Sequence, residues 1–208
     1  MLNLPTGLPA ELVPLSWLLG VWEGTGVVEY RIGEDVVRQE FGQRVSFSHD
    51  GLPYLNYTSH TWLPDGGSAG DDADPIGGAP LVAEAGYWRL SRGFLAGDPG
   101  PGMLPGVGPR PFSTAESVET LRNDSDGFDI QVSLVHPTGV NELYLGEVRG
   151  GRIDLGTDAV MRVEGAKDYS AATRIYGLVE GDLLWAWDIA ALGQQLRSHA
   201  SGRLSRVD

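Results

Sequence analysis

Apolar and polar residues alternate along most of this chain, in short segments that end at glycine, proline, aspartate or asparagine. Alternation places successive side chains on opposite faces of an extended backbone, so the pattern predicts half-buried β-strands. The expected strands span residues 21–32, 36–48, 54–63, 81–91, 113–123, 127–135, 140–148, 152–163, 169–179, 182–188 and 196–207. A short helix is expected before them, over residues 8–19, and a single turn is expected near residues 189–192.

Most of these strands are separated by connections of hairpin size. This spacing predicts an all-β fold: an antiparallel up-and-down β-barrel of about ten strands, of the calycin or fatty-acid-binding-protein type, with a short N-terminal helix. A barrel of that size has room for an internal ligand. One domain over residues 1–208 is expected, because single barrels often reach this length.

Two stretches interrupt the alternation. Residues 65–80 are rich in Gly, Asp and Pro, and residues 97–111 are rich in Gly and Pro. Both lack the apolar side chains that would offset the entropy of ordering them, so both are expected to be mobile loops. They could cover the mouth of the barrel as a lid, but tolerated surface insertions are the favoured interpretation, because long loops cost little stability.

Charge and composition narrow the range of partners. The chain has 28 acidic and 15 basic residues, for a formal net charge of −13. Such a surface repels nucleic-acid phosphates and anionic lipids, so neither a nucleic acid nor a membrane is an expected partner. There is no cysteine, which excludes disulfides and thiolate ligation. Without a signal-peptide pattern or a long apolar run, the sequence predicts a cytoplasmic protein.

A glycine-rich motif opens the first expected strand. It contains Gly20, Trp22, Gly24 and Gly26 in the spacing G-x-W-x-G-x-G. Phosphate-binding glycine motifs follow a strand and open a helix, whereas this motif runs into a strand. The four residues share one face of that strand, where the glycines allow close approach of other groups. We therefore expect Trp22 to fill the base of the barrel.

Without cysteine, the four histidines are the first candidates for a metal ligand. His49 and His136 lie in expected turns, where a solvated side chain is the simplest expectation. His60 lies within a strand, and the pattern leaves open whether it points inward or outward. His199 opens the last strand among small residues at 198 and 200–202, which leave room for a flat ligand. From spacing alone, a surface histidine remains the more common interpretation.

Segments along nearly the whole chain resemble the nitrobindin family, small β-barrels that bind haem. The matching segments are residues 20–26, 57–62, 84–89, 136–139, 166–167, 176–181 and 188–199. The resemblance implies one non-covalent b-type haem per chain, with His199 as the axial iron ligand and Lys167 as a second cofactor-binding residue. It implies a peroxynitrite isomerase that converts peroxynitrite to nitrate at ferric haem, with no catalytic residue beyond the iron. It also implies nitric oxide binding, and it leaves a homodimer open.

The chain departs from the family pattern at three points. Tyr30 is not followed by the usual Thr, Val82 stands near the position of a His, and Gln195 replaces a Pro. These departures keep a second function open: a lipocalin-like carrier of an apolar ligand such as a fatty acid. A third possibility is a homologue without activity, with His199 on the surface.

Several inner side chains have more than one interpretation. A lipid carrier often binds the ligand carboxylate with an inward-facing Arg or Tyr pair, and the candidate arginines are Arg122, Arg174 and Arg203. Tyr176, Trp185 and Trp187 are candidates to scavenge radicals near a haem. Ordinary packing is the favoured interpretation of these three aromatic residues.

Overall fold

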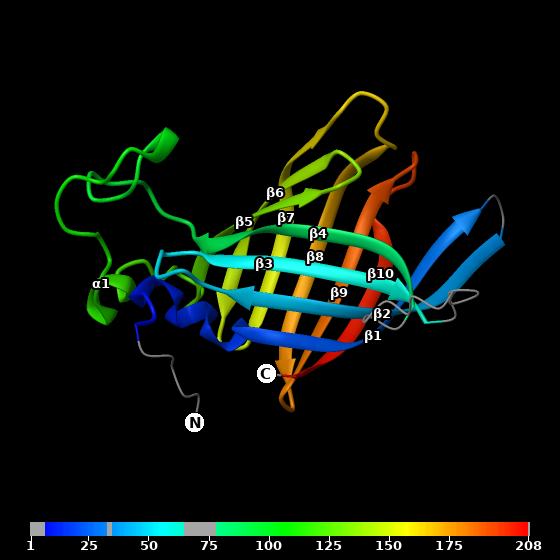
Figure 1. The fold of residues 1–208 in the computed structure, drawn as a ribbon, viewed down its shortest axis with the longest axis horizontal. Coiled ribbons are helices and arrows are strands. Elements are labelled where there is room, and N and C mark those ends of the chain that lie inside the picture. The colour runs from blue at the N-terminus through cyan, green and yellow to red at the C-terminus, as the bar shows by residue number, and fades with distance from the viewer. Residues whose placement is uncertain (1–6, 33–34, 65–77, 208) are drawn as a thin grey trace, which may run out of the picture.

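Ten antiparallel strands form a closed barrel, in which each strand pairs with its neighbours in the chain and β1 pairs with β10 (Figure 1). The computed structural model describes residues 7–32, 35–64 and 78–207. The strands are β1 (Gly20–Ile32), β2 (Asp35–Ser48), β3 (Leu55–Leu63), β4 (Ala79–Leu90), β5 (Phe128–His136), β6 (Val140–Arg149), β7 (Arg152–Arg162), β8 (Tyr169–Val179), β9 (Asp182–Ala191) and β10 (Arg197–Arg206). The predicted up-and-down barrel is confirmed.

The N-terminal segment packs against one end of the barrel. It forms a 3-10 helix, η1 (Ala10–Leu18), where the sequence predicted a helix over residues 8–19. Its side chains Leu12, Leu15 and Leu18 are fully buried and belong to the same core as Trp22 and Trp88. Figure 1 shows η1 at one end of the strands, and its buried side chains close this end of the barrel. No helix in the described part of the chain has the length and hydropathy to span a bilayer.

The glycine motif allows β1 to pass close to its neighbours at this closed end. Trp22 is completely buried, and its Nε1 donates a hydrogen bond of 2.7 Å to the Leu18 carbonyl. A Cβ added at Gly24 would lie 2.2 Å from the Arg203 carbonyl oxygen, and one at Gly26 would lie 2.3 Å from Phe41 Cζ. Gly20 has a φ of 118°, which favours glycine. The expected role of Trp22 at the base of the barrel is confirmed.

The prediction of a strand over residues 113–123 is wrong. Residues 113–123 contain the short helix α1 (Ala115–Glu119) in place of a strand. The Thr114 side chain accepts a hydrogen bond from the Ser117 backbone, and Ser117 caps the Thr114 backbone in return. This reciprocal capping starts a helix, and it outweighs the weak alternation of the segment. The expected turn near residues 189–192 begins later, because β9 continues to Ala191.

The long connection after β4 lies at the closed end. Arg92 pairs with Glu11 of η1 at 2.7 Å and with Asp98 at 2.7 Å, and all three side chains are almost fully buried. A short 3-10 helix, η2 (Pro101–Met103), follows. This connection contains residues 97–111, which therefore do not form a lid over the opposite end. Most of the other expected loop, residues 65–77, lies outside the described residues.

Candidate functional site

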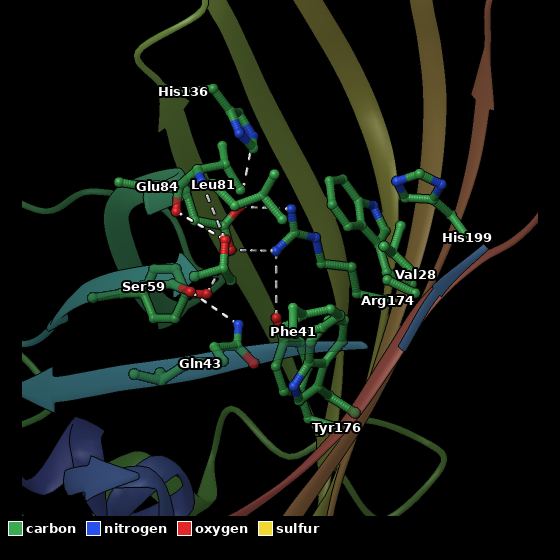
Figure 2. Close-up of a pocket in the computed structure, with 18 of the residues that line it drawn as sticks. Val28, Phe41, Gln43, Ser59, Leu81, Glu84, His136, Arg174, Tyr176 and His199 are labelled. Carbon is green, nitrogen blue, oxygen red and sulfur yellow. Dashed lines mark hydrogen bonds and ion pairs between the residues drawn. The ribbon is translucent and has the colours of Figure 1, made fainter. Parts of the chain in front are cut away.

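A cavity of about 410 Å³ lies inside the barrel, toward the end opposite η1. Its volume falls within the usual range of small-molecule sites. Much of its wall is apolar or aromatic, and Figure 2 shows side chains from several strands pointing into it. The apolar lining includes Val28, Phe41, Val45, Leu183, Trp185 and Trp187. The barrel therefore encloses a site suited to a mainly apolar ligand.

His199 lines this cavity from the beginning of β10. The register between β9 and β10 shifts between Ser198 and Ala200, so His199 occupies a β-bulge. Bulges redirect side chains, and Ala200 beside it has the same access to the cavity. Burial lowers the pKa of His199 below its usual value, although a hydrogen bond with the Glu29 backbone opposes this effect. At neutral pH the imidazole is therefore neutral, as an iron ligand must be.

His136 was expected in a solvated turn, and this expectation is wrong. It is the last residue of β5 and its side chain is only 10% exposed. Its Nε2 lies 2.6 Å from Glu142 Oε2 and 3.7 Å from Glu84 Oε2. The sequence contained a signal for this position: Ile130, Val132 and Leu134 all point inward, and His136 continues their alternation.

Arg174 is the centre of a buried ionic cluster that sequence reasoning missed. Its Nη1 donates to Glu84 Oε1 at 2.7 Å, and its Nη2 donates to Glu84 Oε2 at 2.9 Å and to Glu142 Oε2 at 3.4 Å. Tyr57 donates to Glu84, and Tyr144 donates to Glu142, each at 2.5 Å. Figure 2 shows Arg174 reaching from the side of the cavity that carries His199 toward Glu84.

This cluster holds its two carboxylates in the ionised form. Burial alone would raise the pKa of Glu84, but the attraction and hydrogen bonds of Arg174 outweigh it and lower the pKa to about 2. Burial also opposes ionisation of Glu142, yet hydrogen bonding to His136 and the charge of Arg174 lower its pKa. Because Glu142 is ionised, the Nε2 of His136 carries the hydrogen between them. Burial, with the nearby Glu142, raises the pKa of Tyr144.

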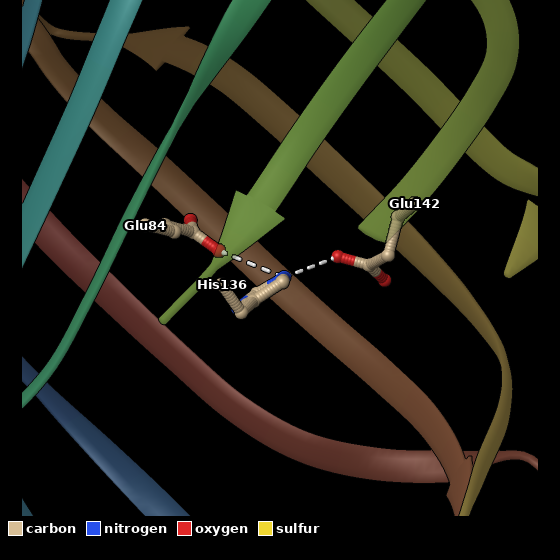
Figure 3. A group of neighbouring side chains, drawn as sticks. All are labelled: Glu84, His136 and Glu142. Atoms are coloured by element: carbon tan, nitrogen blue, oxygen red, sulfur yellow. Dashed lines mark hydrogen bonds and ion pairs between the residues drawn. The ribbon is translucent and has the colours of Figure 1, made fainter. Parts of the chain in front are cut away.

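Glu84, His136 and Glu142 have the spacing of a metal site, since one potential ligand atom of each lies within 4.8 Å of the others (Figure 3). Their hydrogen bonds argue against this role. Arg174 binds both carboxylates, and Tyr57, Tyr144 and Tyr169 donate to them as well. A metal ion would have to displace these donors and lie beside a guanidinium. The three residues are better described as part of a closed hydrogen-bond network.

The arginines also bear on the carrier hypothesis. Arg122 pairs with Glu119 and Arg203 with Asp182 through exposed or partly exposed guanidinium groups outside the cavity. Arg174 faces inward, but two carboxylates already compensate its charge. It therefore offers no free cation to the carboxylate of a fatty acid.

Three buried polar atoms at the cavity wall lack hydrogen-bond partners among the described residues. They are Gln43 Oε1, Trp185 Nε1 and Trp187 Nε1. Buried polar atoms normally have partners, so their presence here is consistent with a cavity that receives a ligand. Together with the neutral imidazole of His199 and the aromatic walls, they fit a flat, mostly apolar group with a metal at its centre.

The remaining predicted residues lie at the edge of the site or outside it. Lys167 is exposed in the connection between β7 and β8 and does not line the cavity. His60 is exposed on the outside of β3, which resolves its open orientation, and His49 is half-buried near the β2–β3 turn. Val82 lines the cavity, so this departure from the family pattern lies at its wall, and Tyr30, which precedes another departure, lines it as well.

Three comparisons with known proteins agree with this geometry. The chain is 69% identical to the peroxynitrite isomerase of Clavibacter michiganensis subsp. michiganensis and 64% identical to that of Leifsonia xyli subsp. xyli, each over all of both chains. The crystal structure of Rv2717c from M. tuberculosis covers 99% of this chain and all of its own, with a TM-score of 0.65 and 26% identity. Residues 11–206 match the model of the THAP4-like, heme-binding beta-barrel domain, and the chain therefore belongs to that family.

Proposed function

We propose that this protein binds haem in the barrel cavity and isomerises peroxynitrite to nitrate. The observation that carries the proposal is His199, a neutral imidazole that a β-bulge places in an aromatic cavity. Relatives that are 64–69% identical over their full length are named peroxynitrite isomerases, which supports the same reaction for this chain.

The residues of the chain have distinct roles in this proposal. His199 would bind the iron through one nitrogen of its neutral imidazole. When bound, ferric haem would supply a Lewis acid for the isomerisation of peroxynitrite to nitrate. Trp185 and Phe41 exclude water from one wall. The isomerisation has no net proton transfer, so it needs no acid–base pair from the protein.

Other features of the proposal extend beyond the cavity. Lys167 is the proposed second cofactor-binding residue, since its ammonium group suits the carboxylate edge of haem. One b-type haem per chain, nitric oxide binding and a single domain over residues 1–208 complete the proposal. A homodimer and a cytoplasmic location stay predictions from the sequence.

A haemin titration followed by absorption spectroscopy tests the proposal. The wild-type protein should give a Soret band that saturates at one haem per chain. His199→Ala should weaken haem binding by about 10-fold or more, which is roughly 1.4 kcal/mol. His60→Ala is the matched control, because that histidine is exposed outside the barrel, and it should bind haem like the wild type.

The activity requires a separate measurement. Mixing the haem-loaded protein with peroxynitrite in a stopped-flow instrument should accelerate peroxynitrite decay, with nitrate as the product. A wild-type spectrum identical to that of free haemin would overturn the haem proposal. Saturable binding of a fluorescent fatty acid in that case would favour the carrier hypothesis.

A further inference from the structure

Trp187 of β9 lies between the ionic cluster and His199. The Cζ atom of Arg174 lies 4.3 Å from the centre of the Trp187 ring, as in a cation–π contact. Trp187 also contacts His199. The two rings pack edge to face, with their centroids 5.5 Å apart and an angle of 83° between their planes. The indole is thus the direct link from the charged groups to the imidazole.

Ring packing holds Trp187 in place. Its Nε1 is buried without a hydrogen-bond partner among the described residues. The rings of His136 and Trp187 are stacked, with an interplanar angle of 13° and a centroid distance of 6.4 Å. The centroids of the Tyr169 and Trp187 rings are also 6.4 Å apart. Arg174, His136 and Tyr169 all bind the same buried carboxylate, Glu142. One network therefore fixes three of the groups that surround the indole.

The imidazole of His199 needs support against rotation. The bond between Cβ and the ring of a histidine has a broad torsional preference, so the plane of the imidazole depends on the groups that pack against it. His199 is followed by Ala200 and Gly202, which offer little side-chain bulk beside it. Trp187 is the aromatic group that the structure places edge to face with this ring.

We infer that Trp187 is a positioning residue that fixes the ring plane of His199, and that the Arg174 cluster acts through Trp187. The inference rests on the proposed function, since ring orientation matters only if His199 binds the haem iron. It also gives the buried charges a role. Arg174 and His136 contact the Trp187 ring, and the buried carboxylates Glu84 and Glu142 hold these two residues in place.

Trp187→Phe and Trp187→Leu test this inference, with Trp185→Phe as the matched control. Trp185 lies two residues earlier on the same strand and lines the same cavity, and its Nε1 also has no hydrogen-bond partner in the described part of the chain. Its ring contact, however, is with Phe41. The readout is the proton NMR spectrum of the ferric, cyanide-bound haem protein. The spread of the haem methyl signals in this state depends on the plane of the axial imidazole.

Both Trp187 variants should change the spread and order of the haem methyl signals, whereas Trp185→Phe, which alters the cavity wall but not the contact with His199, should change them much less. Haem transfer to excess apomyoglobin should be about 10-fold faster for Trp187→Leu, as is usual when a residue that orients a metal ligand is lost. Trp187→Phe should show a smaller increase, because an aromatic ring remains.

The melting temperature of each haem-free variant separates positioning from folding. If Trp187→Leu does not fold, the methyl pattern of Trp187→Phe decides. Wild-type methyl patterns in the folded Trp187 variants would overturn the inference, as would equal changes in Trp185→Phe. Failure of the wild-type protein to bind haem would instead overturn the proposed function, so the two failures are distinguishable.

Discussion

Single residues set how closely the strands of this barrel approach, and Gly24 is the clearest case. Any Cβ at this position would lie 2.2 Å from the Arg203 carbonyl and 3.0 Å from Leu204 Cα, both backbone atoms of β10. Backbone atoms cannot rotate away, so Gly24→Val should strain the pairing that closes the barrel. Overpacking of this kind costs about 1–3 kcal/mol. We expect the haem-free variant to melt roughly 2–12 °C below the wild type.

Gly156→Val is the matched control for this prediction. Gly156 lies in β7, and a Cβ added there meets no atom within 4 Å. Its melting temperature should stay close to that of the wild type. If Gly24→Val also melts like the wild type but loses haem binding, the glycine contacts the ligand and its structural role is wrong.

The positions of some single residues could be predicted from the sequence, and the contacts of others could not. Trp22 could be placed at the barrel base because its parity and the neighbouring glycines are local signals. Arg174 could not be paired from sequence, because its partners Glu84 and Glu142 are 90 and 32 residues away. Alternation alone gives the face of a side chain but does not reveal which distant charges share that face. The burial of His136 was not predicted for another reason, since the proline and glycine that follow it favoured a turn.

At the scale of the elements, the ionic cluster joins four strands, and its pH dependence can be predicted. The pKa of Glu84 falls from an ordinary value of 4.5 to about 2 in the folded protein. A lowered folded-state pKa stabilises the protein above the ordinary pKa, and this stabilisation disappears as the pH falls toward 2. Since one pKa unit corresponds to about 1.4 kcal/mol, Glu84 contributes about 3 kcal/mol at neutral pH.

Glu84→Gln should therefore lower the free energy of unfolding at pH 7 and flatten its decline below about pH 4.5. Urea denaturation at a series of pH values measures both effects. Glu40→Gln is the control, because Glu40 is exposed on β2 and forms no ion pair among the described residues. Parallel pH curves for the wild type and Glu84→Gln would contradict the prediction.

The elements themselves were predicted with one exception. Ten of the eleven expected strands exist, because alternation and turn residues are strong local signals. The segment around α1 was misassigned because Thr114 and Ser117 cap each other, and this pair of hydrogen bonds determines the local structure. The bulge at His199 was also not predictable, since it depends on the register between β9 and β10.

At the scale of the whole molecule, ten strands close around a core at one end and a cavity at the other. The sequence predicted the closed barrel and the place of Trp22 at its base, but it did not show that the η1 side chains fill this end together with Trp22. The η1 side chains and Trp22 occupy one end, so the space near His199 remains for a ligand. The connection over residues 97–111 follows a segment that pairs with η1 at the filled end, so it does not cover the end that holds the cavity.

The net charge of −13 affects the approach of an anionic substrate to the mouth of the barrel. Peroxynitrite and the protein repel each other at long range, and salt screens this repulsion over a Debye length of about 10 Å at 0.1 M. The second-order rate constant of the haem-loaded protein with peroxynitrite should therefore increase as sodium chloride is raised. Carbon monoxide binding to the ferrous protein is the control, because a neutral ligand should show little salt dependence.

A rate constant for peroxynitrite that falls with salt would mean that local positive charge at the mouth outweighs the net charge. Lys167, exposed between β7 and β8, would then be the first residue to neutralise.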